Sequence, residues 1–209
     1  MGSTAGPVAA KLMEIGAIKL NLEKPFTWSS GWKSPVYCDN RLSLSFPHIR
    51  SYIKRCLCEA IRVYCPDAEA IAGVATAGIP QGALVAEELD LPFLYVRPKP
   101  KDHGLENLIE GKVEKDQRVV LVEDLISTGG SSLKAAAALR DGGANVRGMV
   151  AIFTYGFDTA VKNFENDRTE LVCLSDFNHL LEEALRNNYI NSTQLTHIKA
   201  WRLDPANWK

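Results

Sequence analysis

The chain has 209 residues, of which 46% are hydrophobic and 23% are charged, and its formal net charge is −1. This length fits one sizeable α/β domain, and the average composition excludes disordered and fibrous proteins. The balanced charge gives no electrostatic support for nonspecific nucleic-acid binding. No apolar run reaches the ~18 residues of a membrane helix, and the first residues lack the pattern of a secretory signal, so we expect no membrane association.

Short β-branched runs alternate with longer helical segments along the chain. Strands are predicted over residues 70–74, 92–96, 118–122, 146–154 and 170–174. Helices are predicted over residues 46–64, 79–89, 130–140, 157–165 and 176–187, the last capped by Ser175. Such alternation is typical of βαβ units and a mainly parallel sheet. Residues 97–116 are polar and are expected to form a long loop.

We expect a single domain over residues 1–209, with an α/β core of about 46–174. The segments 1–45 and 175–209 lie outside the alternation, and we expect them to form a small subdomain over one end of the sheet, called the hood below. Five cysteines are present, at positions 38, 56, 58, 65 and 173, and none forms a C-x-x-C pair. This odd number predicts free, mostly buried thiols in a reducing, cytoplasmic setting.

One segment, Val119–Ser132, combines an apolar strand, two acids, a glycine- and hydroxyl-rich loop and the start of a helix. The strand delivers Glu123 and Asp124 to the carboxyl edge of the sheet, where ligands of open α/β sheets bind. The glycines allow a close approach to an anion, and the N–H groups of the helix N-terminus can hydrogen-bond it. Two adjacent carboxylates suit the hydroxyls of a vicinal diol. The segment therefore predicts a site for a phosphorylated ribose.

This segment resembles the signature for 5-phosphoribosyl 1-diphosphate (PRPP) in the type I phosphoribosyltransferases. The resemblance implies a central, mainly parallel sheet flanked by helices, with a hood. It also implies that Glu123 and Asp124 hold the ribose diol. The loop that would wrap the 5-phosphate consists of Leu125, Ile126, Ser127, Thr128, Gly129, Gly130 and Ser131.

A second segment, Phe26–Arg41, resembles the N-terminal F-x-x-x-S-G-x-x-S-P-x-Y-x-D-x-R block of the orotate phosphoribosyltransferases. Its turn-forming residues flank a short extended stretch that can present backbone groups to a planar ring. A fixed arginine can bind a carboxylate through two hydrogen bonds. The resemblance therefore implies that orotate lies against Tyr37, Cys38, Arg41 and Ser127.

Two further loops resemble parts of the same enzymes. Within residues 97–104, Arg97, Lys101 and His103 match the catalytic loop, whose cations would offset the charge that grows on the leaving diphosphate. In homodimeric relatives this loop reaches into the neighbouring subunit's site. Residues 73–80 resemble the short loop that contacts the diphosphate through backbone amides, which makes Thr76 and Ala77 further candidates for binding PRPP.

The resemblance covers about residues 12–185. It implies transfer of the 5-phosphoribosyl group from PRPP to orotate, which gives orotidine 5'-phosphate and diphosphate in pyrimidine biosynthesis. It also implies a homodimer and a Mg²⁺ ion held mainly by substrate oxygens, with Asp124 as a candidate contact through water. No dedicated protein ligands for a metal are expected.

Two departures concern the orotate carboxylate. Ser29 stands where some relatives have a lysine. Some relatives also bind the carboxylate with an arginine at the end of the strand near Tyr155 and Gly156, where this chain offers no cation. The candidates that remain are Arg41 and backbone amides near Tyr37 and Cys38.

Three alternative functions stay open at this level. The first is transfer to another base, such as uracil or a purine, against which the Phe26–Arg41 segment argues. The second is a PRPP-sensing regulator, which would carry a DNA-binding module that residues 1–25 are too short to form. The third is an inactive structural homologue, which conflicts with the presence of Arg97, Lys101, His103 and the acid pair.

Overall fold

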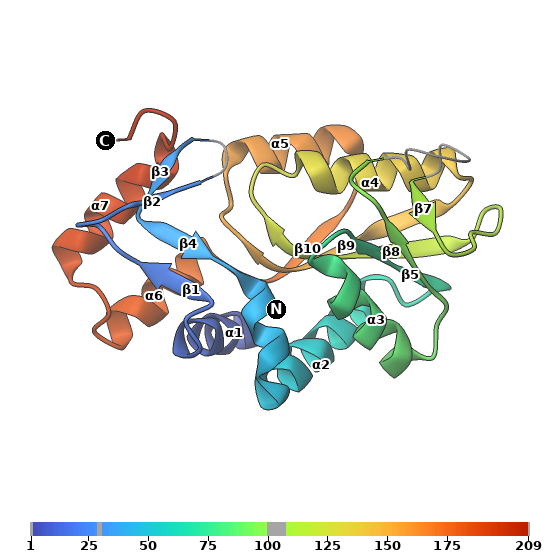
Figure 1. The fold of residues 1–209 in the computed structure, drawn as a ribbon, viewed down its shortest axis with the longest axis horizontal. Coiled ribbons are helices and arrows are strands. Elements are labelled where there is room, and N and C mark those ends of the chain that lie inside the picture. Colours follow the sequence, from blue (N-terminus) through green and yellow to red (C-terminus); the bar gives the residue numbers. More distant parts are fainter. Residues whose placement is uncertain (1, 29–30, 100–107, 209) are drawn as a thin grey trace.

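A computed structural model describes residues 2–28, 31–99 and 108–208 of the chain (Figure 1). Its centre is a six-stranded sheet with the order β10-β9-β8-β5-β6-β7. The strands are β5 (Ala70–Val74), β6 (Phe93–Val96), β7 (Ile109–Glu110), β8 (Arg118–Ile126), β9 (Asn145–Thr154) and β10 (Leu171–Asp176). Every neighbouring pair is parallel except β6 and β7. The predicted mainly parallel sheet is therefore confirmed.

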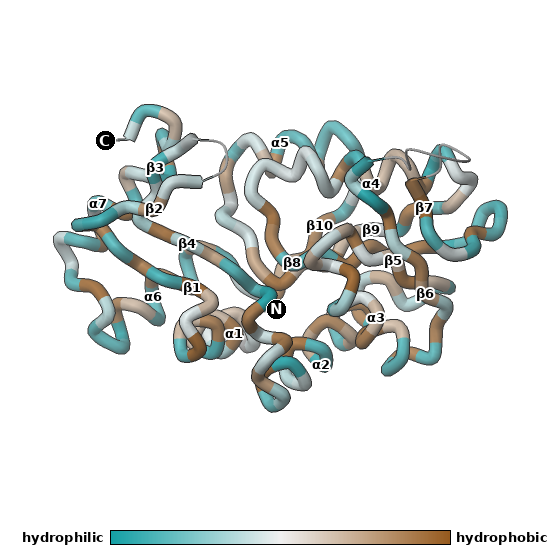
Figure 2. The backbone as a smooth tube through the Cα atoms, viewed as in Figure 1, coloured by the Kyte–Doolittle hydropathy of each residue, from teal (hydrophilic) through white to brown (hydrophobic). Residues whose placement is uncertain are grey.

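Helices cover both faces of this sheet (Figure 1). Helices α2 (Pro47–Tyr64) and α3 (Gly78–Leu89) lie on one face, and α4 (Gly130–Asp141) and α5 (Asp158–Asp167) lie on the other. Strand β8 is consequently buried on both sides, with Val120 and Val122 in one core and Val119 and Leu121 in the other. A continuous apolar run is what such a strand requires. Figure 2 shows the central strands largely in the hydrophobic colour.

The N-terminal and C-terminal parts of the chain lie together beside the sheet (Figure 1). The N-terminal part contains α1 (Gly2–Glu14), β1 (Ile18–Leu20), β2 (Phe26–Thr27), β3 (Lys33–Ser34), β4 (Val36–Cys38) and the 3₁₀ helix η1 (Asn40–Ser45), and the C-terminal part contains α6 (Phe177–Arg186) and α7 (Ser192–Leu203). Trp201 of α7 is fully buried, and its indole N–H donates to the carbonyl oxygen of Lys33 over 3.0 Å. Trp201 thus ties the last helix to the β2–β3 hairpin.

Most of the predicted elements are confirmed to within a few residues, and helix α2 shows why. Pro47 occupies its first turn, and Ile49, Ile53, Leu57 and Ile61, which recur at a spacing of four, are all buried. All five cysteines are free thiols, and three of them are buried, as predicted. In the described part of the chain, no helix is long and apolar enough to cross a membrane.

Three predictions about elements were wrong in detail, and two helices were missed. Strand β8 continues four residues beyond Val122, because β9 pairs with it as far as Ile126. The loop predicted over 97–116 contains β7, which pairs with β6. Helix α6 begins at Phe177 and is capped by Asp176, whose carboxylate accepts from two backbone N–H groups, so Ser175 is not the cap. Helices α1 and α7 were not predicted.

Candidate active site

The two acids of strand β8 occupy different environments. Glu123 is buried, and its carboxylate accepts a hydrogen bond from the Ser132 hydroxyl and one from the backbone N–H of Asp124, each over 3.0 Å. Asp124 is only half-buried. Burial raises the pKa of Glu123 well above its usual range, and the charge of Asp124 adds to this rise. Burial also raises the pKa of Asp124. Asp124 is therefore the acid with more room to meet a ligand.

The sequence predicted a strand that ends at Val122, with both acids just beyond it. In the structure both acids lie within strand β8. Strand β5 pairs with β8 only as far as Val122 and ends at Val74. Among the described strands, Glu123 and Asp124 therefore have a neighbouring strand on the β9 side alone. Their free side faces the N-terminus of α3. There Gly78 packs so closely that a methyl group on it would collide with the carbonyl oxygen of Val122. The acids therefore lie beside the loop between β5 and α3.

Hydrogen bonds to two backbone carbonyl groups fix the end of β8 and the loop that follows it. The oxygen of Ile126 accepts from the backbone N–H of Tyr155 over 3.1 Å, and the oxygen of Thr128 accepts from the Asn163 side chain over 2.9 Å. Gly129 adopts φ +80° against the ring of Phe164, where a side chain would clash. The N–H groups at the start of α4 have no intrahelical partners and can bind an anion.

The predicted phosphate-binding residues differ in what they can offer. Ile126 is fully buried in the core under α4, so only its backbone can take part. Ser127 and Thr128 are half-buried, whereas Gly130 and Ser131 are exposed. The structure thus brings hydroxyls and N–H groups from Ser127 to Ser131 to one loop next to the acid pair.

The loop from Ala75 to Ala77 lies at the same edge of the sheet. Thr76 is exposed and Ala77 is half-buried, directly before helix α3. The Ala77 side chain provides no cap for α3, so the first N–H groups of this helix can bind a ligand as well. Because β5, β6 and β8 are parallel, the loops that follow them meet at one edge.

Of the three basic residues predicted for the catalytic loop, only Arg97 is described; Lys101 and His103 lie outside the described residues. The backbone N–H of Arg97 donates to the carbonyl oxygen of Leu108 over 2.8 Å, which ties the two ends of the loop together. The Arg97 guanidinium lies 3.6 Å from the carboxylate of Glu110. A cavity of about 780 Å³ runs from Arg97 along α4 and includes Ala75, Gly130 and Ser131 in its wall.

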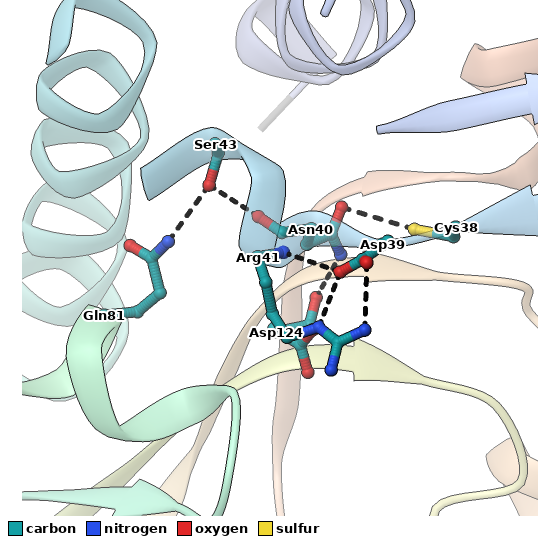
Figure 3. Close-up of polar contacts among 7 residues, drawn as sticks. All are labelled: Cys38, Asp39, Asn40, Arg41, Ser43, Gln81 and Asp124. Atoms are coloured by element: carbon teal, nitrogen blue, oxygen red, sulfur yellow. Dashed lines mark hydrogen bonds and ion pairs between the residues drawn. The ribbon is translucent and has the colours of Figure 1, made fainter. Parts of the chain in front are cut away.

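A buried chain of side chains joins the hood to strand β8 (Figure 3). The side-chain amide of Asn40 donates to the carbonyl oxygen of Asp124 over 2.6 Å. Its oxygen faces the Cys38 thiol at 3.3 Å. The hydroxyl of Ser43 donates to the carbonyl oxygen of Asn40, and Gln81 of α3 donates to that hydroxyl. These contacts hold the segment after β4 against the acid pair.

Sequence reasoning missed Asn40. In the sequence Asn40 is one polar residue of the Phe26–Arg41 segment, and it is not one of the positions that define the motif of that segment. Its full burial and its hydrogen bond across 84 residues of sequence become visible only in the fold.

The residues predicted to bind orotate lie close to Asp124, but their groups are partly engaged. Tyr37 and Cys38 form strand β4, which pairs with β1. Arg41 is bound to Asp39 by two hydrogen bonds, of 2.6 Å from Nε and 2.9 Å from a terminal nitrogen (Figure 3). These bonds lower the pKa of Asp39. A ligand carboxylate would therefore have to compete with Asp39 for Arg41.

Comparison with known proteins defines the class. The family model described as the phosphoribosyl transferase domain matches residues 48–179, more than half of the chain. The chain is 56% identical to an orotate phosphoribosyltransferase of Cytophaga hutchinsonii over 202 residues, which is 97% of each chain. It is also 56% identical to one of Porphyromonas gingivalis over 201 residues, which is 96% of each chain.

A solved structure gives the same result. The orotate phosphoribosyltransferase of Aeropyrum pernix superposes with a TM-score of 0.77 at 32% identity, over 88% of this chain and 99% of that one. The chain therefore belongs to the orotate phosphoribosyltransferase family, within the type I phosphoribosyltransferase fold.

Proposed function

We propose that this protein transfers the 5-phosphoribosyl group from PRPP to a ring nitrogen of orotate, which gives orotidine 5'-phosphate and diphosphate for pyrimidine biosynthesis. The observation that carries this proposal is the 2.6 Å hydrogen bond between Asn40 and Asp124. It fastens the segment that would bind orotate onto the strand that would bind the ribose. Donor and acceptor sites thus become neighbours.

In this proposal PRPP extends along the carboxyl edge of the sheet. Its 5-phosphate binds the loop from Ser127 to Ser131, where hydroxyls and helix N–H groups converge. The ribose hydroxyls donate to the acid pair, mainly to Asp124, which has more room than the buried Glu123. The diphosphate binds the backbone of Thr76 and Ala77, and Arg97, Lys101 and His103 lie on the loop that closes over it. Ser127 lies where the phosphate and the base come closest.

Magnesium fits this site as a substrate-held ion. Among the described residues, no three His, Cys, Asp or Glu side chains gather to hold a metal. Asp124, half-buried beside Glu123, is the residue that would reach the ion through water. When bound, the ion would carry part of the charge of the diphosphate. A positive charge there would also favour the ionised forms of Glu123 and Asp124, whose pKa values burial raises.

The chemistry needs no nucleophile from the protein. The transition state has positive charge on the ribose and growing negative charge on the diphosphate, so the enzyme acts by positioning the two substrates, excluding water and stabilising charge. We further propose a homodimer that shares the catalytic loop of residues 97–104. We also propose a single domain with the hood over its active edge, and a cytoplasmic location in keeping with the five free cysteines.

Replacing Asp124 by asparagine should raise KM for PRPP about 10- to 150-fold, because hydrogen bonds to a charged acceptor contribute about 1.5–3 kcal/mol. Initial rates at varied PRPP and saturating orotate measure this effect. Asp116→Asn is the matched control, since Asp116 is exposed in the turn before β8, at the opposite end of the strand. A KM for PRPP that stays within twofold in Asp124→Asn would remove Asp124 from the ribose site.

The test of the proposed function is an absorbance assay for loss of orotate with PRPP and Mg²⁺. The expected result is consumption of orotate that stops when PRPP is left out and is suppressed when the metal is chelated. An assay without any PRPP-dependent loss of orotate would reject the proposal.

A further inference from the structure

Arg202 of helix α7 brings a guanidinium to the end of strand β9. A Cβ atom built on Gly156 would lie 3.3 Å from a terminal nitrogen of Arg202. Gly156 follows β9 directly, and its φ of +63° favours glycine. The Arg202 side chain therefore fills the space that a side chain at position 156 would occupy. A cation missing from the sequence near Tyr155 and Gly156 is supplied from a helix 46 residues further on.

This guanidinium lines a small pocket next to the proposed phosphate loop. The pocket has a volume of about 290 Å³, and its wall includes Trp32, Thr128, Phe157 and Arg202. Thr128 belongs to the loop proposed to hold the 5-phosphate, while Trp32 and Phe157 contribute aromatic rings that meet at 6.2 Å. In orotate, the carboxylate is attached to the carbon beside the ring nitrogen that accepts the ribose. A carboxylate in this position lies on the ribose side of the ring, and the pocket borders the loop proposed to hold the ribose phosphate.

We propose that Arg202 binds the carboxylate of orotate and so determines the preference for this base; the proposal rests on the proposed function. Planar guanidinium groups bind carboxylates through two parallel hydrogen bonds. Arg202 is already oriented, because its guanidinium lies over the ring of Phe177 at 5.4 Å. A contact with the face of a ring leaves the N–H groups at the edge of the guanidinium able to donate.

Two cations of the hood, Arg41 and Lys33, already have partners. Arg41 is bound twice by Asp39, and the ammonium group of Lys33 donates to the Thr27 hydroxyl over 2.7 Å. Arg202 makes no ion pair with any residue in the described part of the chain. Asp158 also lines the pocket but lies in the first turn of α5, where the helix N-terminus offsets its charge. Arg202 is thus the cation best able to take a ligand carboxylate.

The test compares Arg202→Gln with Lys199→Gln, which removes the same charge from an exposed position on the same helix. The substrates are orotate and uracil, which lacks the carboxylate. In Arg202→Gln we expect KM for orotate to rise about 10- to 150-fold, the range for hydrogen bonds to charged groups. We expect KM for PRPP and kcat/KM for uracil to stay within about twofold, and Lys199→Gln to match the wild type. Arg202→Lys, which keeps the charge, should recover part of the loss.

Several outcomes would overturn the assignment. Equal losses for orotate and uracil would show that Arg202 only supports the hood. An unchanged KM for orotate in Arg202→Gln, with a raised one in Arg41→Gln, would assign the carboxylate to Arg41. If Arg202→Gln does not fold, Arg202→Met replaces it in the comparison. Full activity of Arg202→Met, or an Arg202→Lys variant no better than Arg202→Met, would likewise count against the proposal. Absence of orotate transfer in the wild type would instead reject the proposed function itself.

Discussion

Replacing Lys101 by alanine should lower kcat about 10²- to 10³-fold, while KM for PRPP changes much less. A cation aimed at charge that develops in the transition state contributes roughly as much as a lost oxyanion-hole donor, ~2.7–4 kcal/mol. The prediction rests on the resemblance of residues 97–104 to the catalytic loop, because Lys101 itself lies outside the described residues. The structure shows how the segment that contains Lys101 is anchored, because the backbone N–H of Arg97 donates to the carbonyl oxygen of Leu108.

Steady-state rates with saturating orotate and PRPP measure this effect. Lys112→Ala is the matched control, since Lys112 follows β7 on the same hairpin and its side chain is 85% exposed. An unchanged kcat in Lys101→Ala would exclude a catalytic role for Lys101. A rise in KM for PRPP without a fall in kcat would assign Lys101 to substrate binding alone.

Replacing Trp201 by alanine should lower the free energy of unfolding by about 3–5 kcal/mol, the usual cost of removing a large buried aromatic side chain. Trp201 is fully buried. Its ring lies 5.6–6.0 Å from the rings of Trp28, Tyr155, Phe157 and Phe177. The substitution leaves a cavity among these rings and removes the hydrogen bond to the carbonyl oxygen of Lys33. Urea denaturation followed by circular dichroism measures the loss.

Trp201→Phe separates the two contributions, because it keeps an aromatic ring and removes the indole N–H. We expect it to be more stable than Trp201→Ala by at least 1 kcal/mol. A loss below about 1 kcal/mol in Trp201→Ala would mean that the joining of the two chain ends depends on other contacts. Because Arg202 follows Trp201, the alanine variant should also bind orotate less tightly.

The parallel core could be predicted from the sequence because each of its elements has a strong local pattern. Strand β8 appears as an unbroken apolar run, and the helix after it begins at a glycine pair. The extent of β8 could not be predicted, since its last four residues are strand only because β9 pairs with them. Strand β7 is two residues long and depends wholly on its partner β6. Tertiary pairing decides both cases.

The candidate site was predictable where the chemistry lies on one continuous segment, as in Glu123 to Ser131. It was not predictable where distant segments meet. Asn40 reaches Asp124 across 84 residues, and Arg202 reaches Gly156 across 46. Arg41 is a local case: its position suggests a free cation, but Asp39, two residues before it, binds its guanidinium. Contacts between the hood and the core therefore determine those parts of the candidate site that the sequence alone does not predict.

A competition among bases distinguishes orotate from the other bases that PRPP could be joined to at this site. The protein is incubated with PRPP, Mg²⁺ and equal amounts of orotate, uracil, adenine and guanine, and the nucleotide products are identified by mass. We expect orotidine 5'-phosphate to be the dominant product, in an amount that matches the diphosphate released. A dominant uracil or purine nucleotide, or diphosphate released without any nucleotide, would contradict it.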